Sequence, residues 1–439
     1  MDIIALLMFL GVIIIAFIKK INVGVLALAV GVIAVRVFGL NDKVLIGAIS
    51  SSMLATLVGI TLLFAIINST GALDLMARKI VALAGNHTYI IPIAIYIAGF
   101  VVAGVGPGAV PALAIIPALG VSIAVEVGYN PVMLALIGEC GLMAGRMTPI
   151  TPEAAIIKSA AESAGFGNVM PTVLICQTIT TAVFALVIFV IFKGYKLKKP
   201  INVLSVKELE KFNSKQIISL LGIVAMMVLL ITFDVNIALA AFMVSAVLLL
   251  IGIGDDGACI KALPWSTICM ILGVGALLEV VNTVGGIELM SDAISSVMST
   301  KTAVPFMGVS AGLLSLVSSA LGVVYPTMMP MSAGIAAQVG GVNPVALMAA
   351  VGVGGSLAGV SPLSTGGALI LEALGTNTKD FNKAKQNKEF INLFIYSAIG
   401  LFVIVIVSGL VFNLIANTVT EYKNKVYKGE KNNEPYRIK

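Results

Sequence analysis

Long apolar runs without charged residues recur along this chain of 439 residues and limit what it can fold into. Several contain about 18 or more residues, enough for a helix to cross a hydrocarbon core roughly 30 Å thick. The runs do not alternate between apolar and polar residues, as the strands of a membrane barrel do. Hydrophobic residues make up 59% of the chain and charged residues 11%, whereas soluble domains contain about 25% charged residues. The sequence therefore predicts an all-α polytopic membrane protein.

The second half of the sequence repeats the first. The stretch NSTGALDLMARKI (68–80) returns as NTVGGIELMSDAI (282–294), and GYNPVMLALIGECG (128–141) returns as GVNPVALMAAVGVGG (341–355). Matches in the same order, at nearly one spacing of about 213 residues, indicate an internal duplication.

The duplication divides the chain into two units joined by a polar linker. We expect five spans in each unit, the fourth of them broken, and a re-entrant helical hairpin where a Gly/Pro turn interrupts an apolar stretch. Two full spans joined by a short external turn are the alternative for each hairpin. The expected limits are 1–193 for the first inverted repeat, with its hairpin at 88–127 and broken helix at 131–165; 194–215 for the linker; 216–416 for the second inverted repeat, with its hairpin at 302–340 and broken helix at 343–375; and 417–439 for a polar tail.

The distribution of basic residues predicts the orientation of these units. An odd number of crossings in each unit requires the two units to be inverted. Lys and Arg gather in KGYKLKK (193–199) and in KDFNKAKQNK (379–388), and basic loops between helices mark the cytoplasmic face. The linker is therefore expected in the cytoplasm and both termini outside the plasma (inner) membrane. The basic tail after Thr420 would then lie outside, and it is the one basic segment that does not fit this rule.

Two matched segments interrupt the fourth span of each unit, AGRMTPITPEAAII (144–157) and AGVSPLSTGGALIL (358–371). Proline ends the preceding helix, and freed backbone groups at that depth are tolerated only around a protein-enclosed, wet cavity. The amino end of the following half-helix favours an anion, and the carbonyl end of the preceding one favours a small cation. Such pairs are typical of the binding site of a secondary transporter. The alternative is that each proline only kinks a packed helix.

The candidate substrate-binding residues belong to the two breaks and the two hairpins. They are Gly106, Pro107, Gly108, Ala109, Arg146, Thr148, Pro149, Thr151, Ser318, Ser319, Gly322, Tyr325, Thr327, Ser361, Pro362, Ser364 and Thr365. A coupling Na⁺ is expected near Gly145, Thr148, Gly359 and Ser361.

Three charged residues around the first break have no charged counterpart in the second. An arginine at mid-depth is costly and normally faces a cavity, where the parallel donors of Arg146 would match a carboxylate. Glu139 and Glu153 are the candidates for a coupling proton, because burial disfavours the charged form of a carboxyl group. The alternative is a structural ion pair between Arg146 and either glutamate.

These segments resemble the ion-transporter superfamily, which includes the divalent anion/sodium symporters, and within it the malonate/dicarboxylate carrier (MatC-like) branch. GRMTPITPEA (145–154) is similar to the superfamily segment TPIGTPPN, and the resemblance to the branch rests on GPGAVPALAIIPALG (106–120), YPTMMP (325–330) and GVSPLSTGGA (359–368). The resemblance covers essentially the whole chain and implies two inverted repeats with re-entrant hairpins and a homodimer. The Ser-Asn-Thr hairpin tips of the symporters are replaced here by Pro-Gly-Ala and Ala-Leu-Gly, which leaves backbone amides for an anion and makes sodium coupling less secure.

The sequence therefore predicts a secondary active transporter of a small organic dicarboxylate, such as malonate or a C4 acid, coupled to Na⁺ or H⁺ by an elevator mechanism. The alternatives are a Na⁺/H⁺ antiporter, with Glu139 or Glu153 as the titrating group, and a carrier of another small anion. The lone His87 and the scattered cysteines offer no nucleophile–base pair or metal set, so an enzyme is not expected. The net charge of +6 lies mainly in loops and the tail and does not indicate a nucleic-acid partner.

Overall fold

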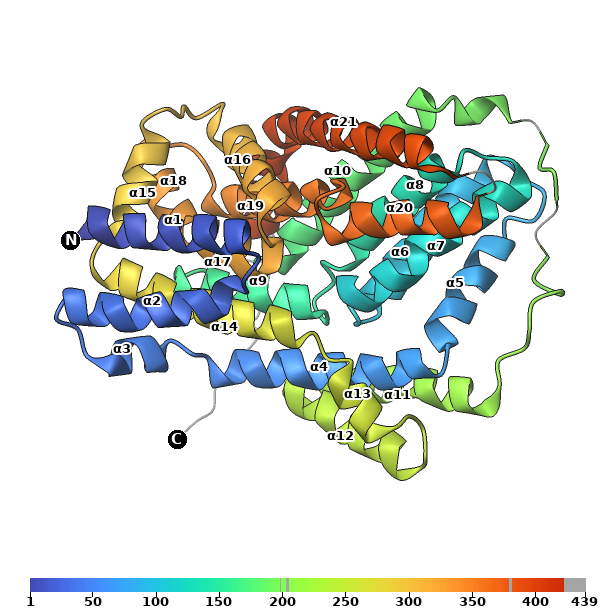
Figure 1. The fold of residues 1–439 in the computed structure, drawn as a ribbon, viewed down its shortest axis with the longest axis horizontal. Helices are drawn as coiled ribbons and strands as arrows, with labels where there is room; N and C mark the ends of the chain where they lie inside the picture. Colours follow the sequence, from blue (N-terminus) through green and yellow to red (C-terminus); the bar gives the residue numbers. More distant parts are fainter. Residues whose placement is uncertain (198, 203–204, 379–380, 422–439) are drawn as a thin grey trace, which may run out of the picture.

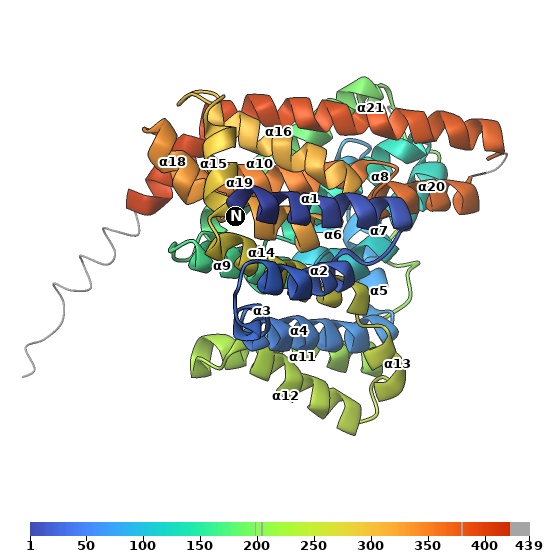
Figure 2. The same cartoon turned by 60° about the vertical axis from the view of Figure 1, so that its left-hand side comes forward.

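The chain folds as a bundle of helices (Figures 1 and 2). The computed structural model describes residues 1–197, 199–202, 205–378 and 381–421, and in these ranges every regular element is a helix. Nine helical segments within the same ranges are long and apolar enough to cross a membrane. The prediction of an all-α polytopic membrane protein is therefore confirmed. Most of the predicted polar tail, residues 422–439, lies outside the described residues.

The two halves contain helices in the same order. The first half comprises α1 (Asp2–Lys19), α2 (Val23–Val37), α3 (Asp42–Gly47), α4 (Ser51–Ser69), α5 (Ala72–Ala82), α6 (Ile90–Gly104), α7 (Ala109–Val127), α8 (Pro131–Gly145), α9 (Pro152–Ser163), α10 (Met170–Ile191) and η1 (Gly194–Lys196). The second comprises α11 (Ser214–Phe233), α12 (Ile237–Leu250), α13 (Asp256–Lys261), α14 (Trp265–Thr283), α15 (Gly286–Ser295), α16 (Ala303–Val317), η2 (Ala320–Val324), α17 (Tyr325–Met328), α18 (Met331–Val339), α19 (Pro344–Leu357), η3 (Ala358–Val360), α20 (Thr365–Asn377), α21 (Lys383–Val407) and η4 (Ser408–Phe412).

The repeated Asn-Pro pair starts the same helix in each half. The Asn130 side chain accepts hydrogen bonds from the first free amides of α8, and Asn343 does so at α19. Proline at the first helical position loses no hydrogen bond, because that amide has no partner within the helix. The repeated dipeptide is therefore a helix start, and both helices then run to a break: α8 ends at Gly145 and α9 begins at Pro152.

The two hairpins differ in their return arms. In the first, α6 and α7 are joined by a turn in which Gly106 and Gly108 have φ values of 134° and 71°, a region that favours glycine. In the second, the return arm is divided into η2, α17 and α18. Pro326 and Pro330 lack the amide that would donate within this arm, whereas α7 is one helix although it contains the matching Pro117.

Glycines bring the hairpins and the broken helices into backbone contact. A Cβ atom added at Gly141 of α8 would lie 1.8 Å from the Tyr96 carbonyl oxygen of α6. One added at Gly354 of α19 would lie 1.9 Å from the Gly308 carbonyl oxygen of α16. Gly141 and Gly354 occupy matching positions of the duplication, and small residues are what lets membrane helices approach so closely. Each hairpin is therefore held tightly to the broken helix of its own half.

Because a side chain has no room at Gly141, we expect the Gly141→Ala variant to be less stable. Overpacking of this kind costs roughly 1–3 kcal/mol. Thermal unfolding of the purified proteins in one detergent measures the effect. Gly11→Ala is the matched control, since no atom lies within 4 Å of a Cβ added in the middle of α1. Equal melting temperatures for the two variants would contradict the contact.

The two halves interlock through their second and fourth helices. Helix α2 packs on α14 and α4 packs on α12. At these crossings a Cβ added at Gly273 would lie 2.1 Å from the Gly24 carbonyl oxygen, and one added at Gly59 would lie 2.9 Å from the Ala238 carbonyl oxygen. In both views these four scaffold helices lie below the group that contains α8, α10, α19 and α21 (Figures 1 and 2). Neither half is a separate domain.

The last helices of the two halves run in opposite directions. The rings of Phe192 and Tyr396 lie 5.4 Å apart, and a Cβ added at Gly400 would lie 3.5 Å from the ring of Phe184. Tyr396 therefore lies beside Phe192, whereas Gly400, which comes later in the chain, lies beside Phe184, which comes earlier than Phe192. Helix α21 is antiparallel to α10.

The open ends of the two hairpins lie at opposite ends of this pair. Beside the first hairpin, Tyr89 donates to the Tyr195 carbonyl oxygen and the Ile201 amide donates to the Val127 carbonyl oxygen. These contacts place its base at the end of α10 that enters the linker, along the right-hand edge of Figure 1. The second hairpin ends next to Asn343, whose side-chain amide nitrogen donates to the side-chain oxygen of Asn417, beyond η4. Its base therefore lies at the other end.

Candidate functional site

Threonine hydroxyls hold the first break between α8 and α9. Thr148 donates to the Gly104 carbonyl oxygen at 2.6 Å, which ties the break to the end of α6. Thr151 donates to the Arg146 carbonyl oxygen at 2.6 Å and accepts from the Ala154 amide at 3.2 Å, as the cap of α9. Both predicted hydroxyl ligands therefore satisfy backbone groups that are left free at helix ends.

Serines play the same part at the second break between η3 and α20. Ser364 donates to the carbonyl oxygens of Ser361, at 2.7 Å, and Gly359, and Ser361 accepts from the Leu363 amide. Carbonyl oxygens expected to bind Na⁺ thus already accept internal hydrogen bonds: Gly359 from Ser364, and Gly145 of the first break from the Thr148 amide. Thr365 is exposed at the first turn of α20.

A cavity of about 360 Å³ lies between the two breaks and the two hairpins. Its polar lining consists of one arginine and seven hydroxyl side chains: Arg146, Thr267, Ser315, Ser318, Ser319, Ser356, Ser364 and Thr365. Among the described residues no acidic side chain lines it. A cavity with a fixed positive charge, many hydroxyls and no carboxylate is suited to a small anion.

Arg146 is the only charged side chain that lines this cavity within the described chain. The residue is 8% exposed, and its side chain donates no hydrogen bond to the described residues. The nearest carboxylate oxygen, Oε1 of Glu153, lies 3.7 Å from its Nε, beyond ordinary hydrogen-bond distance. A buried guanidinium with unused donors is costly, so an anion entering the cavity would gain both charge and hydrogen bonds from it.

Glu153 lies behind Arg146, at the tip of the first hairpin. It is 2% exposed and does not line the cavity. Its Oε1 accepts the Ala109 amide at the start of α7, at 2.8 Å, and its Oε2 has no partner. Of the two ion pairs that the sequence allows for Arg146, the structure contains the one with Glu153.

Glu139 belongs to the first half but lies against the break of the second. It is 0% exposed, and neither carboxylate oxygen has a partner among the described residues. A Cβ added at Gly366 would lie 2.7 Å from its Oε1 and 2.6 Å from the Gly359 carbonyl oxygen. A buried acid, the start of α20 and the Gly359 carbonyl group thus lie close together.

The predicted substrate-binding residues divide into two groups. Those that line the cavity are Ala109, Arg146, Ser318, Ser319, Ser364 and Thr365. Those outside its lining are Gly106, Pro107, Gly108, Thr148, Pro149, Thr151, Gly322, Tyr325, Thr327, Ser361 and Pro362. Of these, Tyr325 is fully buried and donates to the Gly352 carbonyl oxygen, and Thr327 donates to the Val323 carbonyl oxygen four residues earlier in the return arm.

Three hydroxyl residues of the lining are absent from the sequence-based prediction. Thr267 is supplied by α14, Ser315 by α16 and Ser356 by α19. Ser315 donates to the Gly355 carbonyl oxygen at 2.8 Å, across the α16–α19 contact. Ser356 lies five positions before Ser361 on the same interrupted helix, a signal that the sequence offered. Thr267 and Ser315 are isolated residues on other helices, without any local pattern.

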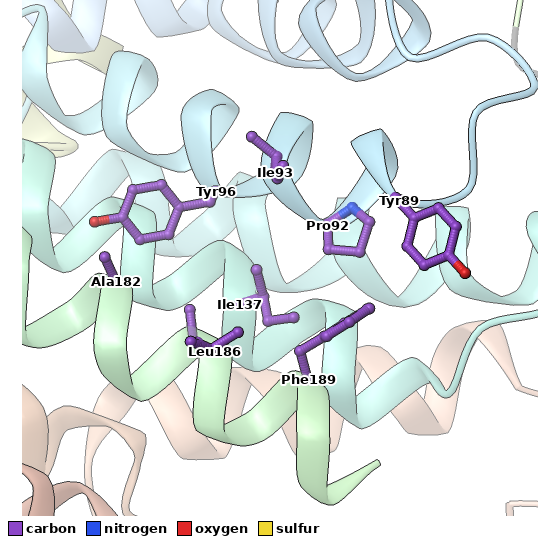
Figure 3. Close-up of a pocket in the computed structure, with 9 residues that line it drawn as sticks. Tyr89, Pro92, Ile93, Tyr96, Ile137, Ala182, Leu186 and Phe189 are labelled. Carbon is purple, nitrogen blue, oxygen red and sulfur yellow. The ribbon is translucent and has the colours of Figure 1, made fainter. Parts of the chain in front are cut away.

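A second cavity of comparable size has a different character. Its volume is about 430 Å³ and it lies between α6, α8 and α10 (Figure 3). The rings of Tyr89, Tyr96 and Phe189 and the side chains of Ile93 and Leu186 surround it, and no charged residue of the described chain lines it. It is not suited to an anion.

Comparison with known proteins gives a family and a fold. A family model described as citrate transporter, CitMHS, matches residues 12–354. The comparison with curated proteins gives no match. One similar solved structure is the YdaH transporter of Alcanivorax borkumensis, with 14% identity, a TM-score of 0.58 and coverage of 83% of this chain and 86% of that one. Another is MtrF of Neisseria gonorrhoeae, an antimetabolite efflux pump, with 16% identity, a TM-score of 0.55 and coverage of 87% of this chain and 84% of that one. At these identities the likeness is one of fold.

The family match spans the first break, the first hairpin and most of α19. It covers well over half of the chain, and the shared fold is that of transporters. The superfamily indicated by the sequence motifs is confirmed, and the protein is a transporter rather than an enzyme. By this match the chain belongs to the CitMHS citrate transporter family.

Proposed function

We propose that this protein moves a small organic anion with two or three carboxylates across the membrane, and that Arg146 binds one of them. The observation that carries the proposal is the buried guanidinium of Arg146, which lines a hydroxyl-rich cavity and makes no side-chain hydrogen bond to the described residues. The cavity of about 360 Å³ falls within the range of small-molecule sites, roughly 300–1,000 Å³. The family description favours citrate, and the resemblance of the motifs to malonate carriers adds malonate and C4 dicarboxylates.

We further propose that the halves are inverted repeats, at the limits given by the sequence, and that the hairpins are re-entrant. The antiparallel course of α10 and α21 and the bases of the hairpins at opposite ends of that pair support this arrangement. In it the linker is cytoplasmic and both termini lie outside the inner (plasma) membrane, because the basic residues of the linker favour the cytoplasmic face.

An elevator movement fits the cavities beside the scaffold helices. One of about 440 Å³ lies between α4, α7 and α13, and another of about 300 Å³ lies between α14, α9 and the return arm of the second hairpin. The matching residues Asn68 and Asn282 line one each. Such gaps let the breaks and hairpins slide against α4 and α14 so that the anion faces each side in turn. A homodimer, which the resemblance of the motifs implies, is part of the same proposal.

The coupling cation, H⁺ or Na⁺, is proposed to neutralise Glu139. An ionised carboxylate without hydrogen-bond donors is strongly disfavoured away from water, and Glu139 has no partner among the described residues. Glu153 is the second choice, because it already has the Ala109 amide and Arg146 nearby. The same unpaired acid is the observation that favours the alternative function, cation/proton antiport without an organic substrate.

Uptake by proteoliposomes tests the function directly. Purified protein is reconstituted, and accumulation of radiolabelled citrate, malonate and succinate is measured with an inward Na⁺ gradient, with a pH gradient and with neither. We expect accumulation of at least one of these anions, driven by one gradient. Sodium-dependent proton flux without uptake of any of the three anions would replace the proposal by the antiporter alternative.

A further inference from the structure

We infer that the side-chain carboxylate of Glu153 acts as an internal stand-in for a substrate carboxylate, that is, it takes the place of that carboxylate in the empty site. It occupies the anion-binding tip of the first hairpin while the carrier is empty, and it competes with an incoming carboxylate for Arg146. The inference rests on the proposed anion site at Arg146 and adds a residue that sets the affinity of that site.

The tip of the first hairpin is built around this carboxylate. Ala109 begins α7, and its amide donates to Oε1 of Glu153 at 2.8 Å. The amino end of a helix carries about half a positive charge and free amides, which is why anions bind there. The preceding residue, Gly108, has a φ of 71°, and a Cβ added to it would lie 2.1 Å from Oε2 of Glu153. A backbone site for an anion therefore exists here, and an internal side chain fills it.

The contact between Glu153 and Arg146 is incomplete. The 3.7 Å between Oε1 and Nε permits attraction between the charges but no hydrogen bond. Nε of Arg146 and Oε2 of Glu153 have no hydrogen-bond partner although both atoms are buried. Bidentate pairing with a free carboxylate gives shorter contacts and about twice the strength of a neutral hydrogen bond. An incoming carboxylate can therefore replace Glu153 as the main partner of the guanidinium.

The two residues are arranged for such an exchange. Arg146 lines the cavity, whereas Glu153 is buried and does not line it. At the position that matches Glu153, the second half has Gly366, which lines the cavity and brings no charge. The empty site thus contains one positive and one negative group and is neutral as a pair. Neutrality lowers the cost of carrying the empty site through the membrane interior, and competition from Glu153 keeps the affinity for substrate moderate.

Chemical rescue tests the stand-in role without reference to transport. We expect formate, compared with chloride at the same ionic strength, to raise the melting temperature of Glu153→Ala more than that of the wild-type protein. The matched control is Glu162→Ala, which removes an exposed acid from the same helix α9 and should respond like the wild type. Equal effects of formate on all three proteins would overturn the inference.

Affinity measurements test the competition. We expect Glu153→Gln, which keeps the size of the side chain and an oxygen for the Ala109 amide, to bind citrate about tenfold more tightly by calorimetry. An unchanged or weaker affinity would overturn the inference, and this variant serves as the test if Glu153→Ala does not fold. If the wild type and Glu153→Gln bind neither citrate, malonate nor succinate, the proposed function fails, and the formate experiment still decides the role of Glu153.

Discussion

Replacing Arg146 by alanine is expected to abolish citrate or dicarboxylate uptake while leaving the protein folded. Truncating one partner of a buried charge pair costs about 2–5 kcal/mol, so uptake at a fixed, low substrate concentration should fall about 30-fold or more. Arg146→Lys should retain part of the activity, since it keeps the charge and loses the parallel donors. Initial rates in proteoliposomes measure both effects.

The matched control removes an arginine that lies outside the cavity. Arg78 is half-exposed on α5 and forms an ion pair with Asp74 one turn away. Exposed pairs of this kind contribute roughly 0–1 kcal/mol, so Arg78→Ala should transport at the wild-type rate. Wild-type uptake by a folded Arg146→Ala protein would contradict the assignment of the anion site to the cavity.

Replacing Glu139 by glutamine is expected to separate transport from its driving force. The amide has the shape of the protonated acid and binds neither a proton nor Na⁺ as a carboxylate does. We therefore expect exchange of labelled for unlabelled substrate across the liposome membrane to continue. Accumulation against a concentration gradient should be lost, so that the internal concentration never exceeds the external one.

The comparison for Glu139 is an acid on the surface of a helix that packs against α8. Glu126 is exposed near the end of α7, and Glu126→Gln should accumulate substrate normally. Normal accumulation by Glu139→Gln as well would exclude Glu139 as the coupling residue and leave Glu153 as the remaining candidate. Loss of exchange together with accumulation, in a protein that unfolds at the normal temperature, would instead place Glu139 in substrate binding.

The positions of the helix breaks are predictable because their causes are local. A proline at the first position of α9 and an Asn-Pro pair at the start of α8 act on backbone groups within four residues. The duplication adds independent support, since the same local signals recur in the second half. For these reasons the sequence locates both interruptions within a few residues.

The partners of the charged groups are not predictable in this way. Glu139 lies against Gly366, although more than half of the chain's length separates them in the sequence, and no sequence pattern indicates that contact. Glu153 meets the Ala109 amide only because the first hairpin folds back onto the break. The hydroxyls of Thr148 and Thr151 are attractive as ligands in the sequence, yet nearby carbonyl groups accept them once the helix is broken. Local polarity shows that a site exists, while the tertiary fold decides which groups remain free to bind.

The interlocked scaffold helices determine the order in which the molecule can be assembled during synthesis. Helices α6, α7, α8 and α10 contact one another within the first half, so they can pack before the second half leaves the ribosome. Helices α2 and α4 cannot complete their packing then, because their partners α14 and α12 are still to be made. Newly inserted chains therefore pass through a stage in which the glycine faces of α2 and α4 meet lipid, and this stage ends only when α14 has entered the membrane.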